Sequence, residues 1–190
     1  MARTLCVYCS SSNALAPEYV EAAREVGVGM VANGWDMVYG GTNAGLMGVI
    51  ADSVKQAGGR VTGVIPEYIR RRGIAHENLD ALIVTADMRE RKAAMDHRAD
   101  AFLVLPGGFG TLEEVFEVLT LKQLQLHSRP IVFLNTRNVY DKLREFLEHL
   151  LEEKFAKPES AVLYHFADTA AEAFAYLEEY KPTLAGSKWL

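Results

Sequence analysis

The sequence contains no hydrophobic run of the length that a membrane helix needs. No stretch approaches the roughly 20 apolar residues that cross a bilayer, and the opening MARTLCVYCSSS has no extended apolar region like that of a signal peptide. Basic residues are in the minority, with 20 Lys and Arg against 25 Asp and Glu, giving a net charge of −5. These absences argue against a nucleic-acid or membrane partner and predict a cytoplasmic protein.

Cysteine is scarce, and Cys6 and Cys9 are the two that the chain contains. Their C-x-x-C spacing suggests a redox or zinc site, but TLCVYCS is typical of a strand, which would turn the two side chains to opposite faces. A structural zinc site needs two further ligands, and the five histidines show no metal spacing. We therefore expect reduced cysteines in or near the core and no metal site.

Two common nucleotide-binding motifs are missing. A dinucleotide fingerprint places G-x-G-x-x-G directly after the first strand, where this chain has CSSSNA. The nearest match, Gly27-x-Gly29-x-x-Ala32, falls inside an expected helix, and the P-loop ending in Gly-Lys-Ser/Thr does not occur. The sequence thus disfavours an NAD-type oxidoreductase and a nucleoside triphosphatase.

Short apolar runs alternate with longer amphipathic runs along the chain. This pattern predicts one α/β domain over 1–190 with a short tail from about 182. Its doubly wound (Rossmann-like) parallel sheet would have six to seven strands and helices on both faces. The strands are expected near 4–10, 35–40, 60–65, 81–85, 101–105, 130–135 and, weakly, 162–166. The helices are expected near 17–32, 45–57, 87–98, 111–127, 138–154 and 169–180.

Two of these strands run into glycine-rich loops, PGGFGT (106–111) and YGGTNAGLMG (39–48). In doubly wound folds ligands bind at the carboxyl ends of strands, and glycines before a helix let a phosphate approach free backbone N–H groups. Three glycines within four positions favour a phosphate site at the first loop over a plain turn. The second loop could hold another part of the same ligand or pack against the sheet.

Two glutamates follow the first loop directly. Thr111 and Glu114 fit the T-x-x-E capping box, in which Glu114 would reach back to the threonine N–H. Helical spacing puts Glu113 on a polar stripe with Glu117 and Thr120, and Glu114 on a more apolar flank. A partly buried carboxylate beside a ligand loop is also a candidate catalytic group. The residues leave capping and catalysis open for Glu114.

Basic residues gather in MRERKAAM (88–95). Arg89, Arg91 and Lys92 stand near the start of an expected helix, where the helix dipole disfavours cations. This placement suggests an anionic ligand or a carboxylate partner, and the alternative is a solvated charged face. For the three arginines at 70–72 we expect a solvated loop.

YGGTNAGLMG, MRERKAAM and PGGFGTLEE, in this order, resemble the LOG (Lonely Guy) family, the cytokinin riboside 5′-monophosphate phosphoribohydrolases. The resemblance extends from VYCSSS to SKWL and so covers essentially the whole chain. It implies hydrolysis of the N-glycosidic bond of AMP and of N6-substituted analogues, giving free base and ribose 5-phosphate. It also implies a homodimer that needs no metal or other cofactor and has its sites near the dimer interface.

The same resemblance implies roles for individual residues. Arg91 and Glu114 would be the catalytic pair, and the first glycine loop would hold the phosphate. The residues that would bind the substrate are Met88, Lys92, Gly107, Gly108, Phe109, Gly110, Thr111 and Thr120. The chain departs from the usual pattern at Thr42, Gly73 and Leu121, where relatives often carry Gly, an acidic residue and Trp, so the preferred base is left open.

Two other functions are alternatives to this one. Some relatives have carried the label lysine decarboxylase, but no local sequence argues for the pyridoxal-binding lysine that such chemistry requires. A non-catalytic nucleotide or cofactor carrier of the same fold stays open, because fold alone does not decide function. A carrier has no need of the Arg91–Glu114 pair.

The helix near 111–127 also bears on assembly. Its apolar residues spread round more of the helix than one core-facing stripe requires, which favours an interface between copies of the chain. They are Val115, Val118, Leu119, Leu121 and Leu124.

Overall fold

The computed structural model describes residues 3–182, so most of the expected tail lies outside the described residues. Within this range seven parallel strands form one sheet in the order β4-β3-β2-β1-β5-β6-β7. The strands are β1 (Arg3–Tyr8), β2 (Trp35–Tyr39), β3 (Val61–Pro66), β4 (Ala81–Thr85), β5 (Ala101–Val104), β6 (Ile131–Leu134) and β7 (His165–Ala167). The predicted parallel, doubly wound α/β fold is confirmed.

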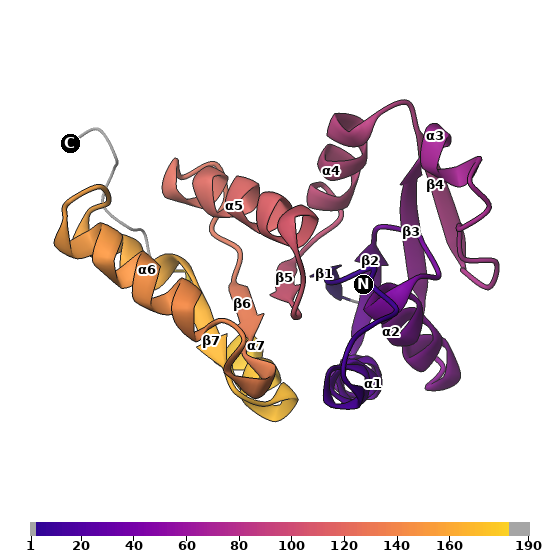
Figure 1. The fold of residues 1–190 in the computed structure, drawn as a ribbon, viewed down its shortest axis with the longest axis horizontal. Helices are drawn as coiled ribbons and strands as arrows, with labels where there is room; N and C mark the ends of the chain where they lie inside the picture. Colours follow the sequence, from indigo (N-terminus) through magenta and orange to yellow (C-terminus); the bar gives the residue numbers. More distant parts are fainter. Residues whose placement is uncertain (1–2, 183–190) are drawn as a thin grey trace.

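Helices cover both faces of the sheet (Figure 1). On one side lie α1 (Pro17–Ala32), α2 (Gly45–Gln56) and α7 (Ala170–Glu179). On the other lie α4 (Met88–Asp96), α5 (Phe109–Gln123) and α6 (Asp141–Glu152). Three short helical elements were not predicted, because one or two turns show too little hydrophobic periodicity. They are α3 (Glu67–Arg70), η1 (Thr136–Asn138) and η2 (Pro158–Leu163). Among residues 3–182 no helix is both long and apolar enough to cross a membrane.

The central strand β1 shows how the sheet supplies both cores. Leu5 and Val7 pack with α1 and α2, and Cys6 and Tyr8 pack on the opposite face with α4 and α5. This alternation is the period-two pattern of a strand buried on both faces. The edge strand β4 differs, since Leu82 is 38% exposed and its neighbours are also largely open. The edge strand is thus less covered than the central strands, while the sheet as a whole has helices on both faces, as predicted.

Both cysteines are free and buried, as the sequence predicts. Cys6 joins the core under α4 and α5, and Cys9, just beyond the end of β1, joins the core under α1 and α2. Burial raises the pKa of both thiols well above the usual range. The thiols are thus neutral and serve as small core side chains.

The apolar surplus on α5 is covered by the chain itself. Val115, Val118 and Leu119 are buried in the core under α4 and α5, and Leu121 and Leu124 are half-buried. The helix lies between the sheet, α4 and η2, so several flanks are occupied at once. The use of these five residues as evidence for an interface between copies is wrong, because it assumed a helix with one buried stripe.

The sheet order determines where the loops meet. The chain runs outward from β1 to β4 and then crosses back, so that β5 pairs with β1 on its other side. The loops after these two strands are joined by a hydrogen bond from the Ser10 N–H to the Pro106 carbonyl, at 3.1 Å. Such a switch in strand order is the usual ligand-binding place of doubly wound sheets.

Candidate active site

A buried ion pair joins α4 to α5 beside this switch point. Nη1 of Arg91 lies 2.6 Å from Oε1 of Glu114, and each residue is 8% exposed. Nε of Arg91 also donates to the backbone carbonyl of Val64 in β3, at 3.2 Å. The structure thus brings together the two residues that the resemblance pairs, from positions 23 residues apart in the chain.

Burial dominates the electrostatics of Glu114. Removal from water raises the pKa of its carboxyl group above that of an ordinary glutamate, and the neighbouring Arg91 guanidinium opposes this shift. The result is a carboxyl that takes up a proton more readily than a solvated one and that depends on Arg91 for its charge. A perturbed carboxyl near a strand switch point is typical of a functional site.

The start of α5 argues against the capping role of Glu114. The helix begins at Phe109 with Gly108 as its N-cap, two residues earlier than predicted. Thr111 therefore lies within the first turn, buried to 4% exposure, and Glu114 lies one turn further on. The capping-box interpretation is wrong, because the capping position is occupied by a glycine and the Glu114 side chain pairs with Arg91.

The glycine loop leaves the N-terminus of α5 open. No side chain caps the helix, and Gly108, Phe109 and Gly110 are exposed. A Cβ added at Gly108 or Gly110 would meet no atom within 4 Å, whereas one at Gly107 would lie 2.1 Å from Oγ1 of Thr111. The first N–H groups of a helix have no partner within it, so this end presents donors and a positive dipole end to an anion.

Lys92 is held on the outer side of the ion pair. Its ammonium group contacts the carboxylates of Glu113 and Glu117 on the polar stripe of α5. Burial would lower the pKa of Lys92, but its hydrogen bonds to these two carboxylates raise it. The predicted contrast is confirmed: Glu113 is exposed and partners a lysine, and Glu114 is buried with an arginine.

Other residues expected at the site lie at its margins. Met88 is half-buried at the start of α4, and Arg89 is exposed. Thr120 is exposed about three turns along α5, and its hydroxyl donates to the Phe116 carbonyl of its own helix. Within one chain the structure does not bring Thr120 to the Arg91–Glu114 pair. The arginines at 70–72 are exposed, as predicted, although Arg70, the last residue of α3, and Arg71, which follows it, both pair with Glu67.

Two contributors to the site were not predicted. The backbone carbonyl of Val64 fixes Arg91, and a Cβ at Gly40 would lie 2.0 Å from Nη2 of the same arginine. The glycine-rich sequence after β2 was the signal that could have identified Gly40. Other glycines of that loop have packing roles: Gly41 (φ +75°) lies on β3 and Gly45 (φ +56°) lies on the Ser11–Ser12 backbone.

A small cavity of about 130 Å³ reaches Glu114 between α4 and α5. Tyr8 at the end of β1 and Leu121 of α5 line it together with polar residues of both helices, including Lys92 and Asp96. At about 30 Å³ per molecule it has room for roughly four waters. Glu114 thus borders a cavity that also has polar residues in its lining.

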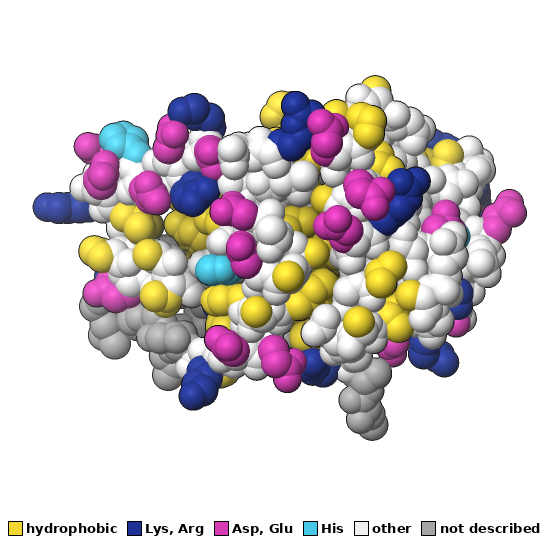
Figure 2. Space-filling view, turned by 90° about the horizontal axis from the view of Figure 1, so that it is seen from below, with side chains coloured by type: hydrophobic (Ala, Val, Ile, Leu, Met, Phe, Trp, Pro, Cys, Tyr) yellow, Lys and Arg dark blue, Asp and Glu magenta, His cyan; other side chains and the backbone are white. Residues whose placement is uncertain are grey.

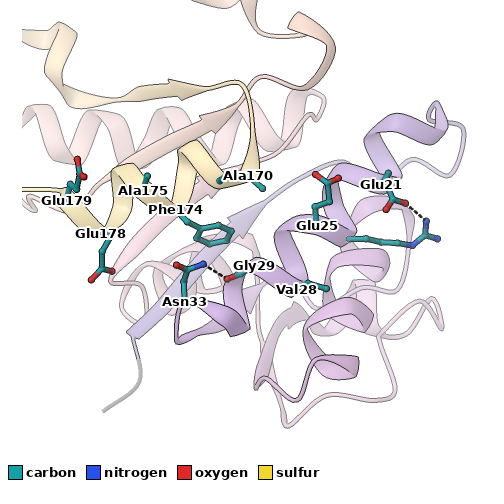
Figure 3. Close-up of a pocket in the computed structure, with 12 residues that line it drawn as sticks. Glu21, Glu25, Val28, Gly29, Asn33, Ala170, Phe174, Ala175, Glu178 and Glu179 are labelled. Carbon is teal, nitrogen blue, oxygen red and sulfur yellow. Dashed lines mark hydrogen bonds and ion pairs between the residues drawn. The ribbon is translucent and has the colours of Figure 1, made fainter.

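A wider groove, of about 970 Å³, lies elsewhere, between α1 and α7. Figure 2 shows the face on the α1 and α7 side, with hydrophobic side chains exposed among carboxylates. The close-up in Figure 3 shows Phe174 of α7 beside Gly29 of α1, with Glu25, Glu178 and other acidic residues around them. Because carboxylates rim this groove, it is unsuited to a phosphate.

Comparisons with known proteins agree with the site. A family model described as "Possible lysine decarboxylase" matches residues 47–177. "Cytokinin riboside 5'-monophosphate phosphoribohydrolase LOG7" of Arabidopsis thaliana is 41% identical over 180 residues, 95% of this chain and 83% of the relative. The chain belongs to the LOG family. A second relative, "Probable cytokinin riboside 5'-monophosphate phosphoribohydrolase LOGL2" of Oryza sativa subsp. japonica, is also 41% identical over 95% of this chain and 74% of its own length.

Solved structures with the same fold include proteins of another function. The molybdenum cofactor carrier protein of Chlamydomonas reinhardtii matches with a TM-score of 0.72 at 23% identity, over 94% of this chain and 98% of its own. The molybdenum cofactor binding protein of Rippkaea orientalis matches with a TM-score of 0.74 at 20% identity, over 94% and 96%. At this identity the likeness shows that LOG proteins and these carriers share a fold.

The three departures from the LOG pattern lie in different surroundings. Thr42 is buried and forms an isolated bridge with Ala75. Gly73 has φ +72°, a backbone conformation that side-chain-bearing residues rarely adopt. Leu121 lines the cavity beside Glu114. In this LOG protein, position 73 thus carries a glycine that its backbone favours.

Proposed function

We propose that this LOG-family protein hydrolyses the N-glycosidic bond of adenosine-type nucleoside 5′-monophosphates, AMP and N6-substituted AMP, to free base and ribose 5-phosphate. The observation that carries the proposal is the buried Arg91–Glu114 pair beside the uncapped end of α5. The names of the two relatives, which share 41% identity with this chain, support the same reaction.

The chemistry needs a negative group near the sugar. As the C1′–N9 bond breaks, positive charge develops on the ribose ring, and the oxygen of a water molecule bonds to C1′ while the purine leaves with the bonding electrons and takes up a proton. Glu114 as a carboxylate stabilises that charge. Because the group is buried and oriented by Arg91, its interaction with the developing charge is stronger than that of a solvated carboxylate.

The glycine loop binds the other end of the substrate. The 5′-phosphate accepts hydrogen bonds from the N–H groups of residues 108–111, where no side chain competes for them. Gly110 and Glu114 are four residues apart, about 6 Å along the helix axis at 1.5 Å per residue. This spacing lets one nucleotide have its phosphate at the helix end and its sugar at Glu114. Met88, Lys92 and Thr120 complete the site in this proposal.

We further propose a single domain that acts as a homodimer in the cytoplasm. Phe109 is 94% exposed and Phe116 is 37% exposed on α5, and an apolar surface of this kind beside a ligand loop suits a partner copy. A second copy could also bring its own Thr120 toward the site. The free buried cysteines are consistent with a reducing compartment.

The test is the release of base from purified protein. With AMP, adenine and ribose 5-phosphate should appear in equal amounts, and adenosine should react poorly because it lacks the phosphate that the loop binds. Equal turnover of AMP and adenosine would contradict the role of the loop. If no purine monophosphate yields base, although AMP binds, a carrier function would replace the enzymatic one.

A further inference from the structure

Gly40 lies where the loop after β2 meets the side chain of Arg91. A Cβ built on Gly40 would lie 2.0 Å from Nη2 of Arg91 and 2.5 Å from Cε of Met47, far closer than atoms can approach. The other two guanidinium nitrogens of Arg91 are used for the carbonyl of Val64 and the carboxylate of Glu114. The bare backbone of Gly40 therefore forms a third side of the space that the guanidinium fills.

The backbone around Gly40 is held in place. Tyr39, immediately before it, is the last residue of β2 and pairs in register with Gly63 of β3. The carbonyl of Gly41, immediately after it, accepts a hydrogen bond from the His76 N–H at 3.0 Å. A side chain at position 40 would thus be accommodated by movement of flexible side-chain ends and not by movement of the loop.

We propose that Gly40 is a positioning residue, whose lack of a side chain keeps the Arg91 guanidinium against Glu114. The inference rests on the proposed function in so far as that pair performs catalysis. Gly40 does not have a positive φ, so an alanine there meets no backbone strain. The added methyl group would displace the Arg91 guanidinium and the end of the Met47 side chain. It would therefore disturb the ion pair more than the fold.

The experiment compares wild type with Gly40→Ala by two measurements. A ¹³C NMR titration of the Glu114 carboxyl should show protonation at higher pH in the variant, because the cation that favours the carboxylate has moved away. With AMP, kcat should fall by about 10²-fold, as expected for a displacement of about 1 Å, with a smaller change in KM. The NMR arm needs no turnover, so it is independent of the proposed function.

Gly29→Ala is the matched control. Its Cβ would lie 2.5 Å from Cε2 of Phe174, also the end of a side chain, but in the α1–α7 groove away from Arg91. This variant should lower the melting temperature and leave the titration of Glu114 unchanged. In an Arg91→Ala background, Gly40→Ala should not shift the titration further, because the group that it displaces is gone.

Three results would overturn the inference. The first is an unchanged Glu114 titration in folded Gly40→Ala, and the second is an additional shift of that titration in the Arg91→Ala background. The third is failure of Gly40→Ala to fold, which would mean that Arg91 does not move away from the methyl group. A wild type that leaves AMP intact contradicts the proposed function instead, and the titration then decides the role of Gly40 alone.

Discussion

At the scale of single residues, burial distinguishes two ion pairs that the sequence places side by side. Lys92 and Glu113 meet near the surface, where such pairs contribute about 0.2–1 kcal/mol. Arg91 and Glu114 meet inside, and removal of one partner from a buried pair costs about 3–5 kcal/mol because the other charge is left uncompensated. The buried pair is therefore a fixed feature of the candidate site.

The two neighbouring glutamates give the first comparison. Glu114→Gln should lower kcat for AMP by about 10²–10⁴-fold, because an amide supplies no negative charge to the developing cation. Its oxygen can still accept from Arg91, so the fold and KM should change less. Glu113→Gln should have a much smaller effect on kcat, because Lys92 retains Glu117. Steady-state kinetics and melting temperatures check both variants, and equal kcat losses would contradict the assignment.

The shifted pKa of Glu114 predicts the dependence on pH. Its carboxylate form should be lost on acidification at a higher pH than for an ordinary glutamate, so the acid limb of kcat/KM should lie above about pH 4.3. The contribution of Glu114 to folding stability changes with pH in the direction opposite to that of a usual carboxylate. Because the folded-state pKa is raised, the contribution of this group is complete below about pH 4.3 and decreases as pH rises through the folded-state value.

Melting temperatures measured as the pH rises through the titration of Glu114 check the direction of this effect on stability. The difference between wild type and Glu114→Gln should fall as pH rises from about 4.3, because only the wild type ionises a buried group. A wild type that gains stability relative to the variant over the same range would show that Arg91 outweighs burial. The acid limb of kcat/KM would then lie at or below that of a free glutamate.

At the scale of elements, the start of α5 combines packing and binding in four residues. Gly107 is needed for packing, because Thr111 lies where its Cβ would be. Gly108 and Gly110 face open space and leave the helix end accessible. One glycine of the loop therefore faces the protein, and two face open space.

This division predicts opposite outcomes for two Gly→Ala variants. Gly110→Ala meets no protein atom within 4 Å, so its melting temperature should be equal or slightly higher, while KM for AMP should rise because the methyl group obstructs the phosphate. Gly107→Ala should lower the melting temperature through its clash with Thr111. Calorimetry and kinetics on both variants test this. An unchanged KM in Gly110→Ala would place the phosphate elsewhere.

The elements also show what could be predicted from the sequence. Helix α1 spans 17–32 as expected, because its apolar period is long and a proline marks its first turn. The start of α5 was misplaced, because Thr111 resembles a cap and Gly108 carries no side-chain signal. The roles of Val64 and Gly40 could not be predicted, because a carbonyl and a missing Cβ act through backbone position.

At the scale of the whole molecule, the strand order assembles the site from distant segments. Because β5 returns to the side of β1, the glycine loop reaches the switch point, and α4 and α5 cover the same face of the sheet. The two helices can be followed in Figure 1. The Arg91–Glu114 ion pair joins them. The wide α1–α7 groove lies on the other face, so this groove and the candidate site are separate.

The dimer is the prediction that concerns the whole molecule. Phe109 and Phe116 are seven residues apart on α5, two helical turns, and therefore share a face that stays exposed in one chain. If copies pack through this face, Phe116→Glu should place a charge in the interface and shift sedimentation at micromolar concentration from dimer to monomer. Val28→Glu, at a 55% exposed position on α1, is the control and should leave the dimer intact. A wild type that sediments as a monomer would contradict the dimer, and a Phe116→Glu variant that remains dimeric would move the interface away from α5.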